Sequence, residues 1–150
     1  MKSIALLVGS IVFFTLILST GCGSNYGAPD GSTITINPTS YSLLNISATS
    51  TTSTIPVIVT VRNKNGVPIP GVVIFISVPT IFLINGFGPV GFIDQNGNAV
   101  TGTQFMAQTD DNGVYSFRFQ YVSGGGANYF GDMVVSSNSA YTTMRFTITP

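Results

Sequence analysis

Apolar and polar residues alternate along most of the chain beyond residue 32, with the two-residue period that is typical of a β-strand. Val57, Val59 and Val61 share one face of the segment 55–63. The segment 115–122 alternates just as strictly, and one of its faces is wholly aromatic: Tyr115, Phe117, Phe119 and Tyr121. Further runs with strand character occupy residues 33–37, 41–47, 72–78, 129–137 and 142–149. The pattern predicts about seven short strands.

Turn signals separate these runs, and none of the segments repeats apolar residues with the period of a helix. The stretch "KNGVPIPG" combines an Asn-Gly turn with Pro68 and Pro70, which suit an edge or a corner of a sheet. The glycine-rich stretch 124–128 lies between two predicted strands and is interpreted as a hairpin loop. Many short strands joined by turns favour an antiparallel β-sandwich over residues 32–150.

The first residues have a different character. Lys2 precedes an apolar run from Ile4 to Leu18, and the small residues 19–21 follow it. A positive residue, an apolar core and a small-residue exit predict a signal peptide over residues 1–21. The alternative is a permanent transmembrane anchor, although a spanning helix needs about 20 apolar residues and this run is shorter.

Cys22 is the only cysteine of the chain and follows this run directly. The stretch Leu18–Cys22, "LSTGC", resembles the lipobox of bacterial lipoproteins, with Ser19 at the position where that family usually has leucine. The resemblance implies that Cys22 is lipidated and that the membrane is a partner through this anchor. Because Gly23 and not aspartate follows the cysteine, it also implies sorting to the outer membrane. A free thiol and an intermolecular disulfide are the alternatives.

The segment 22–31 is rich in Gly, Ser, Asn and Pro and is interpreted as a flexible tether between the anchor and the sandwich.

Charged residues make up only 7% of the chain, which has five basic and five acidic residues and no histidine. A basic patch that neutralises phosphates is therefore excluded, and nucleic acid is not an expected partner. The chain contains no glutamate, so few side chains could move protons. We expect a protein that is not an enzyme and that has no catalytic residues and no cofactor.

Two segments carry a more specific pattern: residues 57–78 read "VIVTVRNKNGVPIPGVVIFISV", and residues 109–119 read "TDDNGVYSFRF". Together they resemble a bacterial immunoglobulin-like domain of the invasin and intimin type (Big-1). The resemblance implies an immunoglobulin-like sandwich that acts in adhesion at the cell surface or as a structural module.

Two acidic stretches are weak candidates for metal binding. The stretch 94–98, "DQNGN", begins like a calcium loop but lacks the later ligands, so it is interpreted as a hairpin turn. Asp110 and Asp111 are adjacent carboxylates that could bind a hard cation, but the stretch "DDNG" is also typical of an ordinary turn. The sequence therefore predicts no metal site with any specificity.

The segment 79–93, "PTIFLINGFGPVGFI", is longer and more apolar than a loop of such a domain should be. Val73 and Phe75 also fall on the expected outer face of the preceding strand. Either this apolar insert folds over that face and buries it, or part of the surface stays exposed. In the second case Val73, Phe75, Phe82 and Phe87 would form an interaction surface for a partner protein, a like subunit or the membrane.

We therefore expect a non-catalytic envelope lipoprotein, either periplasmic or surface-exposed, whose partner is an envelope or surface protein. One alternative is an accessory subunit of a larger envelope complex for secretion, filament assembly or electron transfer. Another is a carbohydrate-binding module, in which glycans would stack on exposed tyrosines: Tyr26, Tyr41, Tyr129 and Tyr141.

Overall fold

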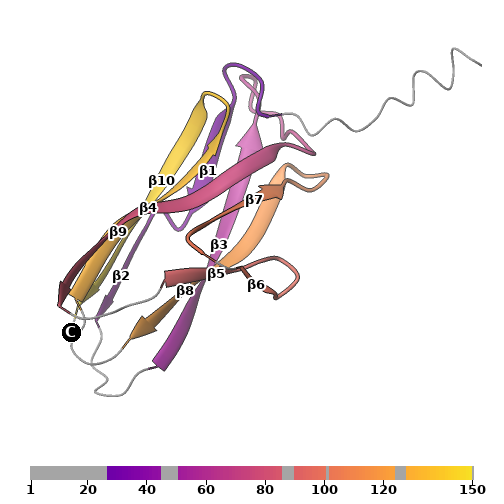
Figure 1. The fold of residues 1–150 in the computed structure, drawn as a ribbon. Helices are drawn as coiled ribbons and strands as arrows, with labels where there is room; N and C mark the ends of the chain where they lie inside the picture. Colours follow the sequence, from indigo (N-terminus) through magenta and orange to yellow (C-terminus); the bar gives the residue numbers. More distant parts are fainter. Residues whose placement is uncertain (1–26, 45–50, 86–89, 101, 124–127, 150) are drawn as a thin grey trace, which may run out of the picture.

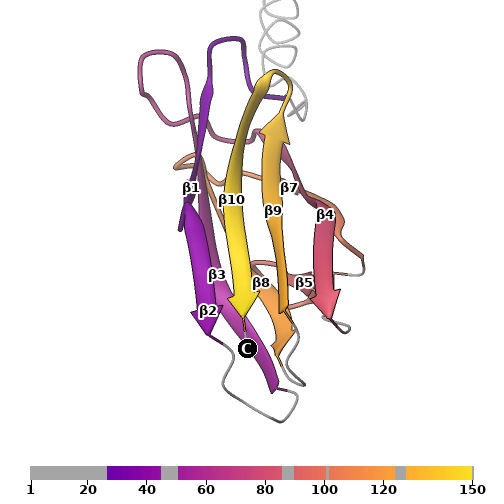
Figure 2. The ribbon, with the colours of Figure 1, turned by 90° about the vertical axis from the view of Figure 1, so that its left-hand side faces the viewer.

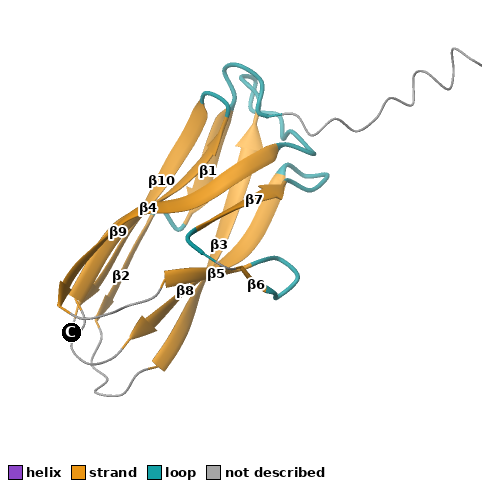
Figure 3. Ribbon diagram, viewed as in Figure 1, coloured by secondary structure: helices purple, strands orange, loops and turns teal. Residues whose placement is uncertain are grey.

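The computed structural model describes residues 27–44, 51–85, 90–100, 102–123 and 128–149. Strands account for the regular structure of this part of the chain, and Figure 3 shows them joined by loops and turns. The predicted signal peptide (1–21) and Cys22 lie outside the described residues.

Ten strands follow one another along the chain. They are β1 (Thr33–Asn37), β2 (Ser40–Leu44), β3 (Thr51–Arg62), β4 (Val73–Asn85), β5 (Val90–Ile93), β6 (Ala99–Val100), β7 (Gln104–Gln108), β8 (Val114–Ser123), β9 (Asn128–Ser137) and β10 (Ala140–Thr149). The alternation predicted about seven strands. The additional ones are β5, β6 and β7, of which β5 and β6, with four and two residues, are too short for a two-residue period to stand out.

The strands form two sheets that pack face to face (Figures 1 and 2). The first sheet has the order β1-β3-β8-β5-β6, and the second has the order β2-β10-β9-β4-β7. All the described strand pairs are antiparallel except β2 with β10. The chain keeps its direction as it passes from β1 to β2 across Pro38, so β2 enters the second sheet parallel to β10 (Figure 2).

The core lies between the sheets and follows the predicted alternation. Val57, Val59 and Val61 are fully buried, and the aromatic face of β8 packs beside them. From the second sheet, β4 contributes Ile74 and Ile76, and β9 and β10 contribute Met133, Val135, Met144 and Phe146. The rings of Phe119 and Phe146 join the two sheets at a centroid distance of 4.9 Å. The all-β sandwich predicted from the sequence is confirmed.

Most of the apolar insert, residues 79–93, belongs to strands. Its first part continues β4 to Asn85, and its last part is β5, which belongs to the other sheet. Phe92 of β5 is only 1% exposed and packs against Phe105, Phe117 and Phe119. This end of the insert therefore extends the core between the sheets and does not fold over the outer face of β4.

The hairpin expected at residues 124–128 is wrong. The strands on either side, β8 and β9, belong to different sheets, so the connection crosses from the first sheet to the second. Local alternation cannot distinguish this crossing from a hairpin, because both begin and end with a strand. Residues 124–127 themselves lie outside the described residues.

Candidate functional site

The outer face of the second sheet carries exposed apolar side chains. On β4, Ile74 and Ile76 point into the core, so Val73 and Phe75 point outward. Val73 is half-buried and Phe75 is 38% exposed. Of the other two residues expected on this surface, Phe82 belongs to β4 but its side chain is not described, and Phe87 lies outside the described residues.

Met106, on the edge strand β7, extends this exposed surface. It stands directly opposite Phe75 in the β4–β7 register and is 72% exposed. We name Val73, Phe75 and Met106 the β4–β7 patch. Met106 was not predicted to belong to this surface, although the alternation of "QFMAQ" between Gln104 and Gln108 places it on one face with the two glutamines. The patch is thus flanked by uncharged polar side chains.

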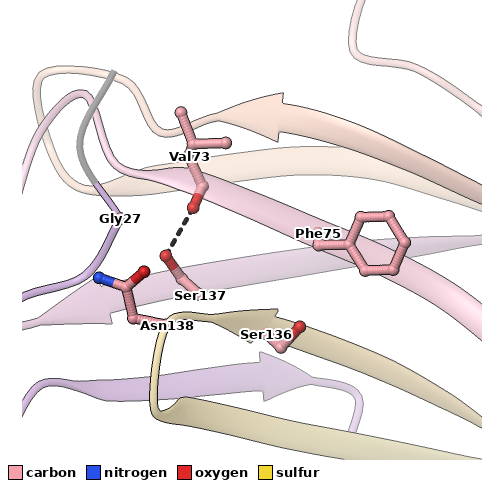
Figure 4. A pocket seen from close by; sticks show the side chains of 6 residues that line it. All are labelled: Gly27, Val73, Phe75, Ser136, Ser137 and Asn138. Carbon is pink, nitrogen blue, oxygen red and sulfur yellow. Dashed lines mark hydrogen bonds between the residues drawn. The ribbon is translucent and has the colours of Figure 1, made fainter. Parts of the chain in front are cut away.

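A shallow pocket of about 270 Å³ adjoins the patch at the start of β4 (Figure 4). Val73 and Phe75 line one side, and Ser136, Ser137, Asn138 and Gly27 line the rest. The Ser137 hydroxyl donates a hydrogen bond to the Val73 carbonyl at 2.6 Å and accepts one from the Ala28 amide at 2.8 Å. Because its proton is already engaged, this serine serves the fold and is not arranged as a nucleophile.

The residues that line this pocket also fix the position of Ala28, near the start of the described chain. Asn138 donates a side-chain hydrogen bond to the Ala28 carbonyl at 2.9 Å, and Ala28 itself is only 1% exposed. A Cβ atom added at Gly27 would overlap the Asn138 side chain, so a larger residue there would displace that side chain. The sandwich therefore includes Ala28, whereas the composition assigns it to the tether that ends at residue 31.

Three turns share one hydrogen-bonding pattern, and this pattern accounts for the acidic candidates. Each begins with Asn or Asp and has glycine at the fourth position: residues 63–67, 94–98 and 110–114. In the last of these, Asp110 Oδ1 accepts hydrogen bonds from the amides of Asn112 and Val114 at 2.9 and 2.8 Å. The side chain thus mimics a backbone turn.

These contacts lower the pKa of two carboxyl groups. The Val114 amide contributes most for Asp110, and the Asn98 amide contributes most for Asp94. Asn63 occupies the same position in the first turn, which shows that the pattern needs an oxygen acceptor and not a charge. The residues predicted as weak cation ligands therefore sit in a turn, with Asp111 exposed beside Asp110. The described residues contain no cluster of three or more His, Cys, Asp or Glu that could hold a metal.

The acidic residue of β9 is paired across the sheet. Asp132 and Arg145 are register partners on β9 and β10, and their side chains form a salt bridge at 3.0 Å on the outer face. The guanidinium holds the pKa of the Asp132 carboxyl below its usual range. Both side chains are exposed to solvent, where such a pair contributes little to stability.

The tyrosines suggested as a glycan platform lie in different environments. Tyr41 is partly buried and packs against Tyr121 at a centroid distance of 6.3 Å, and a hydrogen bond with Tyr121 raises the pKa of Tyr41 to about 12. Tyr141 is 72% exposed. The side chain of Tyr129 is not described, and Tyr26 lies outside the described residues. Tyr41 and Tyr141, the two whose side chains are described, therefore do not form a common stacking surface.

No helix in the described part of the chain is long and apolar enough to cross a membrane.

Comparison with known proteins supports the fold. No protein-family model matches the chain, and no curated protein matches its sequence significantly. Among solved structures, it is similar to the N-terminal domain of PorA, with a TM-score of 0.50 and 9% identity over 78% of this chain and 96% of that one. A weaker likeness, with a TM-score of 0.40 and 8% identity, links it to the ASH/PapD-like domain 7 of human CEP192, over 84% of this chain and 90% of that one. The likeness to PorA supports an immunoglobulin-like β-sandwich.

Proposed function

We propose that this protein is a non-catalytic lipoprotein of the bacterial envelope whose sandwich acts as an interaction module. The observation that carries the proposal is the β4–β7 patch, in which Phe75 and Met106 stand side by side and exposed at the edge of a sheet. Exposed apolar groups that adjoin one another, with uncharged polar residues around them, are typical of a surface that another macromolecule covers.

The chemistry of the described residues favours interaction over catalysis. Asp94 and Asp110 are used as turn acceptors, and Asp132 is paired with Arg145. Each of these contacts lowers the pKa of the carboxyl group, whereas a general base or acid at neutral pH needs a raised one. The Ser137 hydroxyl is engaged by the backbone of β4.

The N-terminal sequence supports the membrane assignment. The apolar run and "LSTGC" supply what acylation of Cys22 requires, and two or more acyl chains hold a protein on a bilayer stably. Ala28 is the first buried residue of the sandwich, and six residues of fully extended chain from Cys22 reach at most about 20 Å. The sandwich would therefore work close to the lipid surface, in our proposal that of the outer membrane.

Site-specific photo-crosslinking tests the interaction directly. A photoreactive amino acid is placed at Met106 of the full-length protein in intact cells, and the matched control carries it at Thr143. Thr143 is an exposed residue of the interior strand β10, outside the patch. We expect discrete crosslinked products from position 106 and far fewer from position 143. Equal or absent products at both positions would contradict the proposed function.

A further inference from the structure

The strand β7 forms an open edge of the second sheet. Within the described part of the chain it pairs with β4 alone. Toward β4, the Thr109 amide donates to the Val72 carbonyl at 3.0 Å, and the Thr103 carbonyl accepts from the Val78 amide at 2.8 Å. Because backbone groups alternate in direction along a strand, those of Gln104 and Met106 point away from β4, toward the open edge.

This edge lacks the features that normally prevent strand pairing. It has no proline and no charged residue, and its register with β4 is regular. Proteins usually protect open edges with such features or keep the edge strand very short. In the other sheet, the edge β6 is very short, with two residues, and the edge β1 presents only polar side chains outward. β7 instead presents Met106, the most exposed apolar residue of the patch.

We propose that two copies of this chain associate through their β7 strands, antiparallel and around a two-fold axis at Met106. This inference rests on the proposed function and names the partner of the patch as a second copy. The pairing would join the second sheets of both copies into one continuous sheet. Met106 would exchange backbone hydrogen bonds with its counterpart, and the two patches would form one apolar surface across the axis.

The sequence of β7 is self-complementary in this arrangement. A two-fold axis at Met106 sets Gln104 opposite the other copy's Gln108, and Phe105 opposite its Ala107. Glutamine thus meets glutamine on the outer face, and a large side chain meets a small one on the inner face. In a symmetric pair, a charged residue at or near the axis would face a residue of the same charge on the other copy and repel it. β7 carries no charged residue, so this repulsion does not arise. This freedom from repulsion favours a second copy over a partner of opposite charge.

The membrane restricts the geometry of such a dimer. The two-fold axis of an antiparallel strand pair runs perpendicular to the sheet. Two copies anchored in the same face of a bilayer are related by a two-fold axis that runs along the membrane normal. Their paired sheets must therefore lie parallel to the membrane. The reach of about 20 Å between Cys22 and Ala28 permits this orientation, because it keeps each anchored end near the lipid surface.

A charge swap at the axis tests the proposal. We measure self-association of the detergent-solubilised full-length protein by analytical ultracentrifugation, for the parent, M106K and M106E. Each variant alone sets like charges opposite each other and should associate at least about tenfold more weakly. An equimolar mixture of the two should restore the dimer. The T143K and T143E variants, changed on the interior strand β10, should associate like the parent.

Several results would overturn the proposal. They are a monomeric parent, a dimer that M106K does not weaken, and a mixture that fails to restore association. Crosslinks from position 106 to another protein, with no product of two identical chains, would also overturn it while leaving the proposed function intact. No crosslinks from position 106 at all would overturn both.

Disulfide trapping in membranes supplies an independent measurement. Directly paired residues on antiparallel strands that exchange hydrogen bonds have Cα atoms about 5.5 Å apart, within the range that a disulfide bridges. M106C should therefore form a linked dimer on mild oxidation, whereas T143C should not. The parent, which contains only Cys22, controls for a disulfide at that residue. A linked dimer in T143C as readily as in M106C would contradict the pairing.

Discussion

Phe75 and Met106 stand directly opposite each other on neighbouring strands at the edge of the second sheet, and both expose much of their side chains. The two neighbours of Phe75 on β4, Ile74 and Ile76, are fully buried. One short stretch of strand therefore supports the core with one face and presents an apolar surface with the other.

This division predicts that binding and folding can be separated by mutation. Replacing Met106 by Ser should change the free energy of unfolding by less than about 0.5 kcal/mol, because the side chain is mostly in solvent. Replacing Ile76 by Ala should cost about 2–5 kcal/mol, because it leaves a cavity in the core. Urea unfolding at protein concentrations too low for self-association measures both. A large loss of stability in M106S would show that the methionine serves the fold.

The contact between Asn138 and Ala28 predicts a graded effect on stability. Asn138 has a φ of 50°, a conformation that glycine adopts freely and alanine does not. N138G should lose only the hydrogen bond to the Ala28 carbonyl, at a cost of about 1 kcal/mol. N138A should lose about 1–2 kcal/mol more through backbone strain. Equal stability of N138G and the parent in urea unfolding would show that the contact contributes nothing.

Two glycines in equivalent turn positions form a matched pair. Gly66 and Gly113 have φ values of 79° and 70°, but a Cβ atom at Gly66 meets nothing within 4 Å, whereas one at Gly113 lies 2.8 Å from the Val61 carbonyl oxygen. G66A should cost about 1–2 kcal/mol from φ alone. G113A should cost about 1–3 kcal/mol beyond that, because the β3 backbone must shift. Thermal unfolding compares the two, and equal costs would contradict the close approach.

The acidic turns predict how stability depends on pH. The pKa of Asp94 and of Asp110 is lower in the folded chain than the ordinary 3.8, so their contribution is present above that value and is lost as the pH falls below it. Asparagine serves the same purpose at position 63. The D94N/D110N variant should therefore keep its stability at pH 7 and lose less than the parent between pH 5 and about pH 2.

Urea unfolding across this pH range measures the effect. The control is the D111N variant, which removes a charge from the same turn as Asp110. We expect its stability to fall with pH as that of the parent does. If D94N/D110N were as acid-sensitive as the parent, protonation of these turn carboxylates would not contribute to the loss of stability.

Much of the fold could be predicted from the sequence because the core alternates strictly. The valines of β3 and the aromatic face of β8 identified the inner surfaces of their strands correctly. Which sheet a strand joins could not be predicted. The alternation of apolar and polar residues shows which face of a strand is buried, but it does not show which strands lie beside it. The link between β8 and β9, expected as a hairpin, and the parallel entry of β2 are examples.

The candidate surface could be predicted only in part. Val73 and Phe75 could be placed on an outer face from their position in an apolar strand. Met106 could not be added to them, because its proximity to Phe75 results from a pairing between strands about 30 residues apart in the chain. The assignment of Cys22 remains a prediction from the sequence, since it lies outside the described residues.

The central claim is that the sandwich is held at a membrane through Cys22 and works there as a binding surface. The most direct measurement is the intact mass of the mature protein purified from membranes, with fragmentation of its N-terminal peptide. We predict a chain that begins at Cys22 and carries a diacylglyceryl group on sulfur and an acyl chain on the α-amine. A chain with residues 1–21 still attached, or with an unmodified thiol at Cys22, would contradict the account.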